Sequence, residues 1–293
     1  MHSRSSSFWR RYQIPIFFVL AYALSWLVWG TYIAQQHGLL SFHLPESFFA
    51  YFALTLATVI VAWFAGGKSA LLDLLHRLLR WRVGIQWYAL ALLVPVVLSL
   101  LPAAIYWLFG RPVPMGVAVP LGAAVVYFFT FGAKAWVTEE IAWRGFALPR
   151  LESGRSALAA SVILGLLWGV WHTPLFLIAG TAQSGWPYIG FLLFAIAESI
   201  LVTWIYNNSR GSVLLATIFH AATDAALSFS GVLFGDQLLF WLTVAIFWVA
   251  AIIVVIVAGP SRLIRGKPTE QELAAIAPPD AASREVPETA SIR

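Results

Sequence analysis

Several ionisable side chains interrupt stretches of the sequence that are otherwise strongly apolar. A charged group costs free energy in hydrocarbon, so each one marks a candidate functional position in a membrane protein. The embedded set comprises Lys134, Glu139, Glu140, Arg144, His172, Glu198, His220 and Asp224. Most of these residues fall into three short patterns, and each pattern has its own chemistry.

The first pattern is the pair of adjacent carboxylates Glu139 and Glu140, followed by Arg144. Glu140 and Arg144 are four residues apart and can form an ion pair on one helix face. Glu139 points about 100° away on an α-helix, and no neighbour in the sequence can pair with it. An unpaired carboxylate in a dry site suits a general base or acid. The alternative is a salt-bridge cluster at a helix end in the membrane interface.

The other two patterns each contain a histidine. His172 follows Trp168 in an aromatic helix, where it is either a ligand or a satisfied core residue. His220 and Asp224 lie four residues apart on one helix face, as in helical metal sites. The alternative is that Asp224 only fixes the tautomer of His220.

The composition indicates which elements must position these residues. Of the 293 residues, 60% are hydrophobic and 11% are charged, whereas a soluble protein has roughly 25% charged residues. This excludes a soluble enzyme, a disordered protein and a nucleic-acid module. We expect an all-α integral membrane protein with eight transmembrane helices, at about 14–34, 48–66, 86–109, 118–137, 157–179, 188–206, 212–230 and 237–258.

The connecting segments alternate in charge. Setting aside Lys134 and Arg144, nearly all basic residues fall on one side of the predicted membrane, and the other side holds only Arg111. The positive-inside rule then predicts that both termini are cytoplasmic. This asymmetry explains the pI of about 9.7 without nucleic acid as a partner. We expect a multi-pass protein in the plasma membrane of a prokaryote.

The chain divides into three parts. Residues 1–13 are expected to form a cytoplasmic N-terminus, 14–260 the membrane domain and 261–293 a disordered cytoplasmic tail. Residues 71–82 predict an amphipathic helix that either lies in the cytoplasmic interface or packs under the bundle. The sequence has no Cys, which excludes disulfides and thiolate chemistry.

The depth of each residue in the membrane decides whether the three patterns can meet. Glu139 reaches the depth of the histidines only if the fourth helix is long, spanning about 120–148 and ending before Pro149. Lys134 then also enters the membrane, and Glu198 is a candidate partner for it. On the fifth helix, Gly165 and Gly169 form a small-residue stripe that allows close helix packing.

With a long fourth helix, we expect Glu139, His172, His220 and Asp224 to converge in a polar cavity that opens to the cytoplasm. A carboxylate, two imidazoles and a second acid are the parts of a metal-assisted or glutamate-driven hydrolase.

Over roughly 118–230, the three patterns resemble those of the CPBP intramembrane proteases, also known as the Abi or CAAX prenyl protease type 2 family. The family motif EExxxR matches Glu139, Glu140 and Arg144. Its FxxxH motif matches at His172, with Trp168 in place of Phe. Its third motif, a histidine followed four residues later by Asn or Asp, matches His220 and Asp224.

The resemblance implies an intramembrane endopeptidase in which Glu139 activates water. His172 and His220 would bind a metal or stabilise the oxyanion, with Asp224 supporting them. Glu140, Arg144 and Trp168 would be structural. The site would either hold a divalent metal such as zinc at His172, His220 and Asp224, or work without metal. The implied partners are membrane lipid and a peptide or lipidated protein, prenylated (CAAX-type) or otherwise membrane-associated.

Two other functions are also compatible with the sequence alone. One is a non-catalytic immunity or scaffold protein that keeps the fold without the chemistry. The other is a proton-coupled transporter, which would also place carboxylates and histidines inside the membrane. Against the transporter, the sequence shows no internal repeat and no pair of broken helices.

Overall fold

The computed structural model describes residues 2–113, 119–232, 236–266 and 269–278. Within these ranges every regular element is helical, and eight helices are long and apolar enough to cross a membrane. The all-α membrane class is therefore confirmed. The candidate spans are Ser7–Gln36, Phe49–Leu78, Ile85–Leu108, Leu121–Glu152, Ala157–Leu177, Tyr188–Asn208, Val213–Ser230 and Gln237–Ala258.

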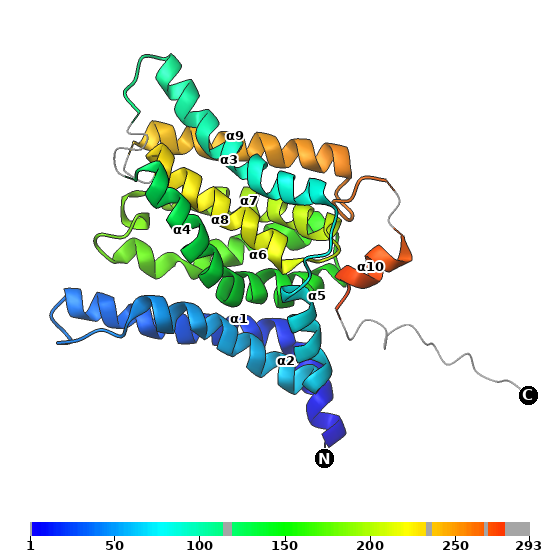
Figure 1. Ribbon diagram of the computed structural model, residues 1–293. Coiled ribbons are helices and arrows are strands. Elements are labelled where there is room, and N and C mark those ends of the chain that lie inside the picture. The colour runs from blue at the N-terminus through cyan, green and yellow to red at the C-terminus, as the bar shows by residue number, and fades with distance from the viewer. Residues whose placement is uncertain (1, 114–118, 233–235, 267–268, 279–293) are drawn as a thin grey trace, which may run out of the picture.

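The helices form two groups (Figure 1). Helices α1 (His2–Gln36) and α2 (Glu46–Leu78) form an antiparallel pair along one side of the molecule. The second group comprises α3 (Ile85–Leu108), α6 (Ala157–Trp171), α7 (Tyr188–Asn208), α8 (Val213–Ser230) and α9 (Gln237–Ala258). In this group α8 packs on α3, and α7 packs on both α6 and α9.

The fourth span joins the two groups. It consists of α4 (Leu121–Ala135), the π-helix η1 (Trp136–Ala147) and α5 (Leu148–Glu152). The long helix predicted from the depth of Glu139 is therefore present. Its end differs from the prediction, because the helix continues through Pro149 to Glu152 rather than stopping before the proline. Pro149 is tolerated because it lies in the first turn of α5, where a missing backbone N–H costs little.

Helix boundaries follow local capping chemistry. The hydroxyl of Ser156 accepts a hydrogen bond from the amide of Ala159 at the start of α6, and Ser212 does the same for Leu215 at the start of α8. Helix α8 ends at Gly231, which adopts a left-handed conformation with φ of 81°. These signals fix where His172 and His220 stand along their helices.

Helix α2 changes direction at Gly67, whose φ of 60° and ψ of −148° are open to glycine without a steric penalty. Beyond this kink lies the segment that was predicted to be an amphipathic helix. This segment packs against the bundle, which was the second of the two alternatives given by the sequence; the first was a helix lying in the membrane interface. Arg77 is 1% exposed and faces the protein, whereas Leu72 and Leu75 are exposed.

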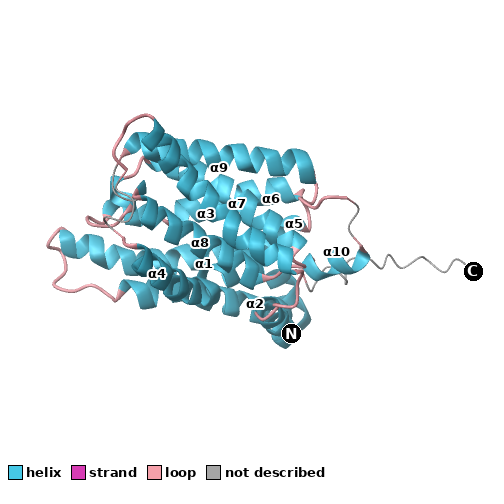
Figure 2. Ribbon diagram, turned by 45° about the horizontal axis from the view of Figure 1, so that its top comes forward, coloured by secondary structure: helices cyan, strands magenta, loops and turns pink. Residues whose placement is uncertain are grey.

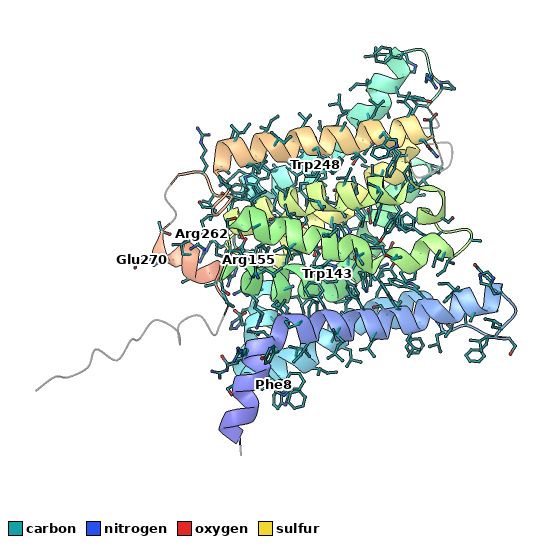
Figure 3. The ribbon with its side chains drawn as sticks, turned by 180° about the vertical axis from the view of Figure 1, so that it is seen from behind. Phe8, Trp143, Arg155, Trp248, Arg262 and Glu270 are labelled. Carbon is teal, nitrogen blue, oxygen red and sulfur yellow. The ribbon has the colours of Figure 1, made fainter. Side chains whose placement is uncertain are left out.

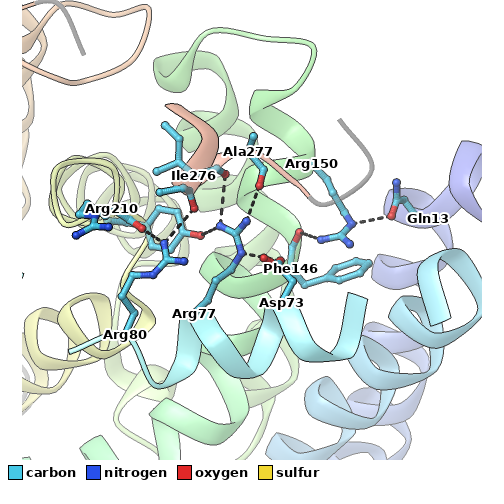
Figure 4. A network of polar contacts seen from close by, with 11 residues as sticks. Gln13, Asp73, Arg77, Arg80, Phe146, Arg150, Arg210, Ile276 and Ala277 are labelled. Atoms are coloured by element: carbon cyan, nitrogen blue, oxygen red, sulfur yellow. Dashed lines mark hydrogen bonds and ion pairs between the residues drawn. The ribbon is translucent and has the colours of Figure 1, made fainter. Parts of the chain in front are cut away.

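Arginines gather at the end of the bundle where α1 begins (Figure 4). Arg77 donates hydrogen bonds to Asp73, to the hydroxyl of Tyr206 and to the carbonyls of Ile276 and Ala277. Close by, Arg150 donates to Gln13 and to the carbonyl of Phe146. Residues from both ends of the chain therefore share one end of the molecule, as an even number of spans requires.

Part of the predicted C-terminal tail is folded. Helix α10 (Glu270–Ile276) lies at the basic end, and Figure 2 shows it beside the end of the bundle near the N-terminus. Figure 3 shows Arg155, Arg262 and Glu270 at this same end. The rest of the predicted tail beyond residue 278 lies outside the described residues.

Two apolar clusters hold the bundle together. One is built around Trp29, Trp143 and Trp171, from α1, η1 and α6. The other is built around residues of α3, α7, α8 and α9, with Phe219 and Phe247 fully buried. His172 contacts a ring of each cluster, Trp171 of the first and Phe191 of the second, so the packing of both clusters fixes its position.

Candidate active site

The four residues predicted to converge line one pocket of about 130 Å³. Glu139 comes from η1, His172 from the residue that ends α6, and His220 and Asp224 from α8. They are separated in sequence by as many as 85 residues, and three packed helices bring them together.

The π-helical stretch of the fourth span presents the two adjacent carboxylates to different neighbours. Glu139 is 2% exposed, and its Oε2 accepts a hydrogen bond of 3.2 Å from the indole Nε1 of Trp168. Glu139 lines the pocket and makes no ion pair among the described residues. The carboxylate is therefore held by one neutral donor and faces the pocket. Single π-helical segments inside α-helices are often found at functional sites.

Glu140 is fully buried and serves a different purpose. Its Oε1 accepts a hydrogen bond of 2.8 Å from Nη1 of Arg144, which is the ion pair expected from the spacing. The same oxygen lies 2.8 Å from Nδ1 of His220. Glu140 therefore fixes both the buried arginine and the orientation of one active-site imidazole. The second contact spans 80 residues, so helical spacing could not reveal it.

His172 is oriented by the backbone of its own helix. Its Nδ1 lies 2.9 Å from the carbonyl oxygen of Trp168, which can only accept, so this nitrogen carries a proton. The chain leaves the α-helix at this residue and continues as the 3-10 helix η2 (Thr173–Leu177). In the neutral ring, Nε2 then has a free lone pair that can accept a proton.

His220 and Asp224 lie on one face of α8, as the spacing predicted. The Nε2 of His220 is 3.8 Å from Oδ2 of Asp224, which is too far for a direct hydrogen bond. Glu140, rather than Asp224, therefore sets the orientation of the His220 ring. The Asp224 side chain is 30% exposed, the most open of the four. It lies beside the free nitrogen, where it can accept a hydrogen bond through water.

Aromatic rings form the walls around both imidazoles. The Trp168 ring makes edge-to-face contacts with His172 and His220, with ring centroids 5.9 and 5.1 Å apart. The guanidinium of Arg144 lies 5.1 Å from the Trp168 ring centroid. Trp168 thus supplies the expected aromatic wall. It also supplies a donor to Glu139 that the phenylalanine of the family motif lacks.

Close packing of α6 against α7 places His172 at its depth. A Cβ atom added at Gly165 would lie 2.7 Å from the Cα of Ile196 and 2.8 Å from the carbonyl oxygen of Ala195. At Gly169 the nearest atom would be a side-chain carbon of Leu192, at 2.8 Å. The small-residue stripe predicted on this helix therefore faces a neighbouring backbone.

The proposed pairing of Lys134 with Glu198 is not found. Both residues line the pocket, but there is no ion pair between these two described side chains. The Lys134 Nζ instead lies 3.5 Å from the ring centroid of Tyr51. Tyr51 and Tyr127 also line the pocket. Neither tyrosine was singled out in the sequence, because aromatic residues are common throughout the spans.

The pocket contains side chains of the types that bind metal ions, namely His172, His220, Glu139 and Asp224. Within the described residues, no group of three or more His, Asp or Glu side chains is arranged to hold a metal ion. The Nδ1 atoms of His172 and His220 are engaged with the carbonyl of Trp168 and with Glu140, which leaves Nε2 of each ring without a direct hydrogen bond among the described residues.

Comparison with known proteins covers this same part of the chain. Residues 120–226, which contain all four pocket residues, match the family described as type II CAAX prenyl endopeptidase Rce1-like. CAAX prenyl protease 2 of Methanococcus maripaludis is 30% identical over 148 residues, which cover 43% of this chain and 52% of that protein. The match spans about half the length of this curated relative. Over residues 120–226, this multi-pass membrane protein is similar to the type II CAAX prenyl endopeptidase Rce1-like family.

Proposed function

We propose that the protein is an intramembrane endopeptidase that hydrolyses a peptide bond with water activated by Glu139. The observation that carries the proposal is the environment of Glu139. Its carboxylate is 2% exposed, is held by the indole of Trp168 and shares a small pocket with two histidines. A carboxylate held in a dry, polar-lined pocket is suited to general base catalysis.

The geometry favours different roles for the two histidines. The Nδ1 of His172 carries a proton, so its Nε2 can accept a hydrogen bond from the attacking water and orient that water toward Glu139. His220 is flanked by Glu140 at Nδ1 and by Asp224 near Nε2. Two carboxylates would stabilise a His220 cation, which could then donate from Nε2 to the developing oxyanion.

The reaction then proceeds in two steps. In the first, the water oxygen bonds to the substrate carbonyl carbon, Glu139 takes a water proton, and the carbonyl oxygen becomes an oxyanion facing His220. In the second, the C–N bond breaks as Glu139 returns the proton to the leaving nitrogen. The products are a carboxylic acid, which then ionises to a carboxylate by releasing its proton to solvent, and an amine; no step passes through a metal.

We propose prenylated peptides of the CAAX type, cleaved near their C-terminus, as the first substrates to test. This rests on the family match and on the name of the relative from Methanococcus maripaludis. Location in the membrane suits a lipidated substrate, whose prenyl chain can remain in the hydrocarbon while the peptide enters the pocket.

The test uses purified protein in detergent or liposomes with matched prenylated and unprenylated peptides. Mass spectrometry in ¹⁸O-labelled water identifies the bond cut and shows the label in the new carboxylate. We expect cleavage of the prenylated peptide that Glu139→Gln abolishes and that a chelator leaves unchanged. Chelator sensitivity with restoration by zinc would overturn the metal-free mechanism.

The same assay separates the competing functions. A scaffold protein would give no product with any peptide, although the fold remains intact. A transporter would also give no product, but in liposomes it would move protons on addition of substrate. Either result would contradict the proposed hydrolysis.

A further inference from the structure

Lys134 is a cation in the pocket that the proposed mechanism does not use. It lies in the last turn of α4 and lines the pocket together with Glu139. Its ammonium lies 3.5 Å from the ring centroid of Tyr51 and 4.8 Å from that of Phe131. Among the described residues it forms no ion pair and donates no hydrogen bond, so its three N–H donors have no anionic acceptor.

A charged lysine side chain in this position costs free energy, so its presence calls for a functional explanation. It belongs to a predicted span, where a charged side chain is expensive. The two aromatic faces offset part of that cost through cation–π attraction. The rings also restrict the ammonium to one side of the pocket, while the side chain remains partly accessible.

We infer that Lys134 is a specificity-determining residue whose ammonium binds the free C-terminal carboxylate of the peptide substrate. This inference rests on the proposed function and names the kind of substrate end that the site selects. A peptide cut in the middle of a long chain would bring no carboxylate near Lys134. A peptide cut close to its C-terminus would bring one.

The spacing between Lys134 and Glu139 fits a short leaving group. Lys134 and Glu139 are five residues apart on the fourth span, which rises at most about 7.5 Å over this distance because most of it is the wider π-helix η1, and an extended peptide covers about 3.5 Å per residue. A carboxylate roughly two to four residues beyond the scissile bond would therefore reach the ammonium. The pocket of about 130 Å³ is also too small for a long folded segment beyond the cut.

The alternative is that Lys134 only offsets the negative charge of Glu139 and Asp224, which line the same pocket. In that case its removal would change the chemistry for every substrate equally. A carboxylate-binding role predicts a different result, because the loss would depend on the charge at the substrate terminus.

The test compares peptide pairs that are identical except for a free acid or a carboxamide at the C-terminus. We expect wild-type protein to cleave the acid with a kcat/KM about tenfold higher than the amide, mainly through KM. Lys134→Gln should lower the acid to the level of the amide and leave the amide within about twofold of wild type. Lys134→Arg, which keeps the charge, should retain most of the preference.

Lys68→Gln is the matched control, because Lys68 is exposed and lies outside the pocket. Equal cleavage of acid and amide by wild type would overturn the inference, as would an equal loss of both in Lys134→Gln. If wild type cleaves neither peptide, the proposed function fails. The inference is then tested by whether the product-length acid peptide raises the thermal midpoint of wild type more than its amide does. Equal shifts would overturn it, and this readout also serves if Lys134→Gln does not fold.

Discussion

The two adjacent carboxylates of the site, Glu139 and Glu140, have different roles because they contact different neighbours. Glu139 has one neutral hydrogen-bond donor, Trp168, and faces the pocket. Glu140 is fully buried between Arg144 and His220. We therefore expect substitution of the first to affect catalysis, and substitution of the second to affect both folding and the orientation of His220.

Glu140→Gln tests this division. The amide cannot neutralise Arg144, which is itself fully buried. Breaking a buried ion pair by removing one partner typically costs about 3–5 kcal/mol. We expect a clearly lower thermal midpoint in detergent together with reduced activity. Glu139→Gln is the matched comparison, and its midpoint should remain close to that of wild type. The reverse pattern would contradict the assignment of roles.

At this scale the sequence predicted four ionisable residues that meet in the pocket but not all of their contacts or the aromatic residues around them. Spacing alone indicated the Glu140–Arg144 pair, because both residues lie on one helix. The contact between Glu140 and His220 and the bond from Trp168 to Glu139 depend on how separate helices pack. No local pattern encodes that packing, so Glu198 was proposed for Lys134 and aromatic partners were found instead.

Among the elements, the fourth span and helix α6 set the geometry of the site. Hydrophobicity placed the end of the fourth span near residue 137, whereas the depth of Glu139 predicted a long helix to about 148, and the structure agrees with the second prediction. The π-helical form of Trp136–Ala147 was not predicted, because apolar periodicity does not distinguish a wide helix from an α-helix over so short a segment. Pro149 was misread as a stop signal, although it lies in the first turn of α5.

Gly165→Ala tests whether close packing of α6 on α7 positions His172. The new Cβ would lie 2.7 and 2.8 Å from backbone atoms of Ile196 and Ala195, which cannot move independently. Overpacking of this kind costs about 1–3 kcal/mol. We expect a lower thermal midpoint and lower activity, measured on the same preparation.

Alanine substitutions at two other glycines serve as comparisons for Gly165→Ala. Gly169→Ala should be milder, since the nearest atom belongs to the flexible side chain of Leu192. Gly122→Ala, in α4, meets nothing within 4 Å. It should be neutral or stabilising by up to about 1 kcal/mol, through helix propensity alone. If all three substitutions behaved alike, the packing argument would be wrong.

For the whole molecule, the basic side of the membrane predicted from the charge asymmetry corresponds to one end of the folded bundle. Arginines from α2, α5 and the loop before α8 gather at the end that also holds α10 and the start of α1 (Figure 4). The eight spans and this basic end could be predicted from composition and charge. The docking of α10 could not, because its polar sequence is typical of a disordered segment, and Arg77 holds it through backbone carbonyls.

The orientation in the membrane remains a prediction that the sequence makes easy to test. The chain has no cysteine, so single cysteines can be introduced into an otherwise unreactive protein. Gly154→Cys lies in an exposed loop at the basic end, and Ser41→Cys lies in the exposed loop between α1 and α2. An impermeant maleimide added to intact cells should label Ser41→Cys at once. It should label Gly154→Cys only after the membrane is permeabilised, and the opposite pattern would reverse the predicted topology.

The central claim is that Glu139 activates the water that cleaves the peptide. The most direct measurement is the kcat/KM of Glu139→Gln relative to wild type on a peptide that wild type cleaves, with Glu270→Gln as a control on the exposed helix α10. A lost general base typically lowers the rate about 10²–10⁴-fold. We predict a loss of that size for Glu139→Gln, with an unchanged thermal midpoint and full activity in the control. Activity of folded Glu139→Gln within a few-fold of wild type would contradict the account.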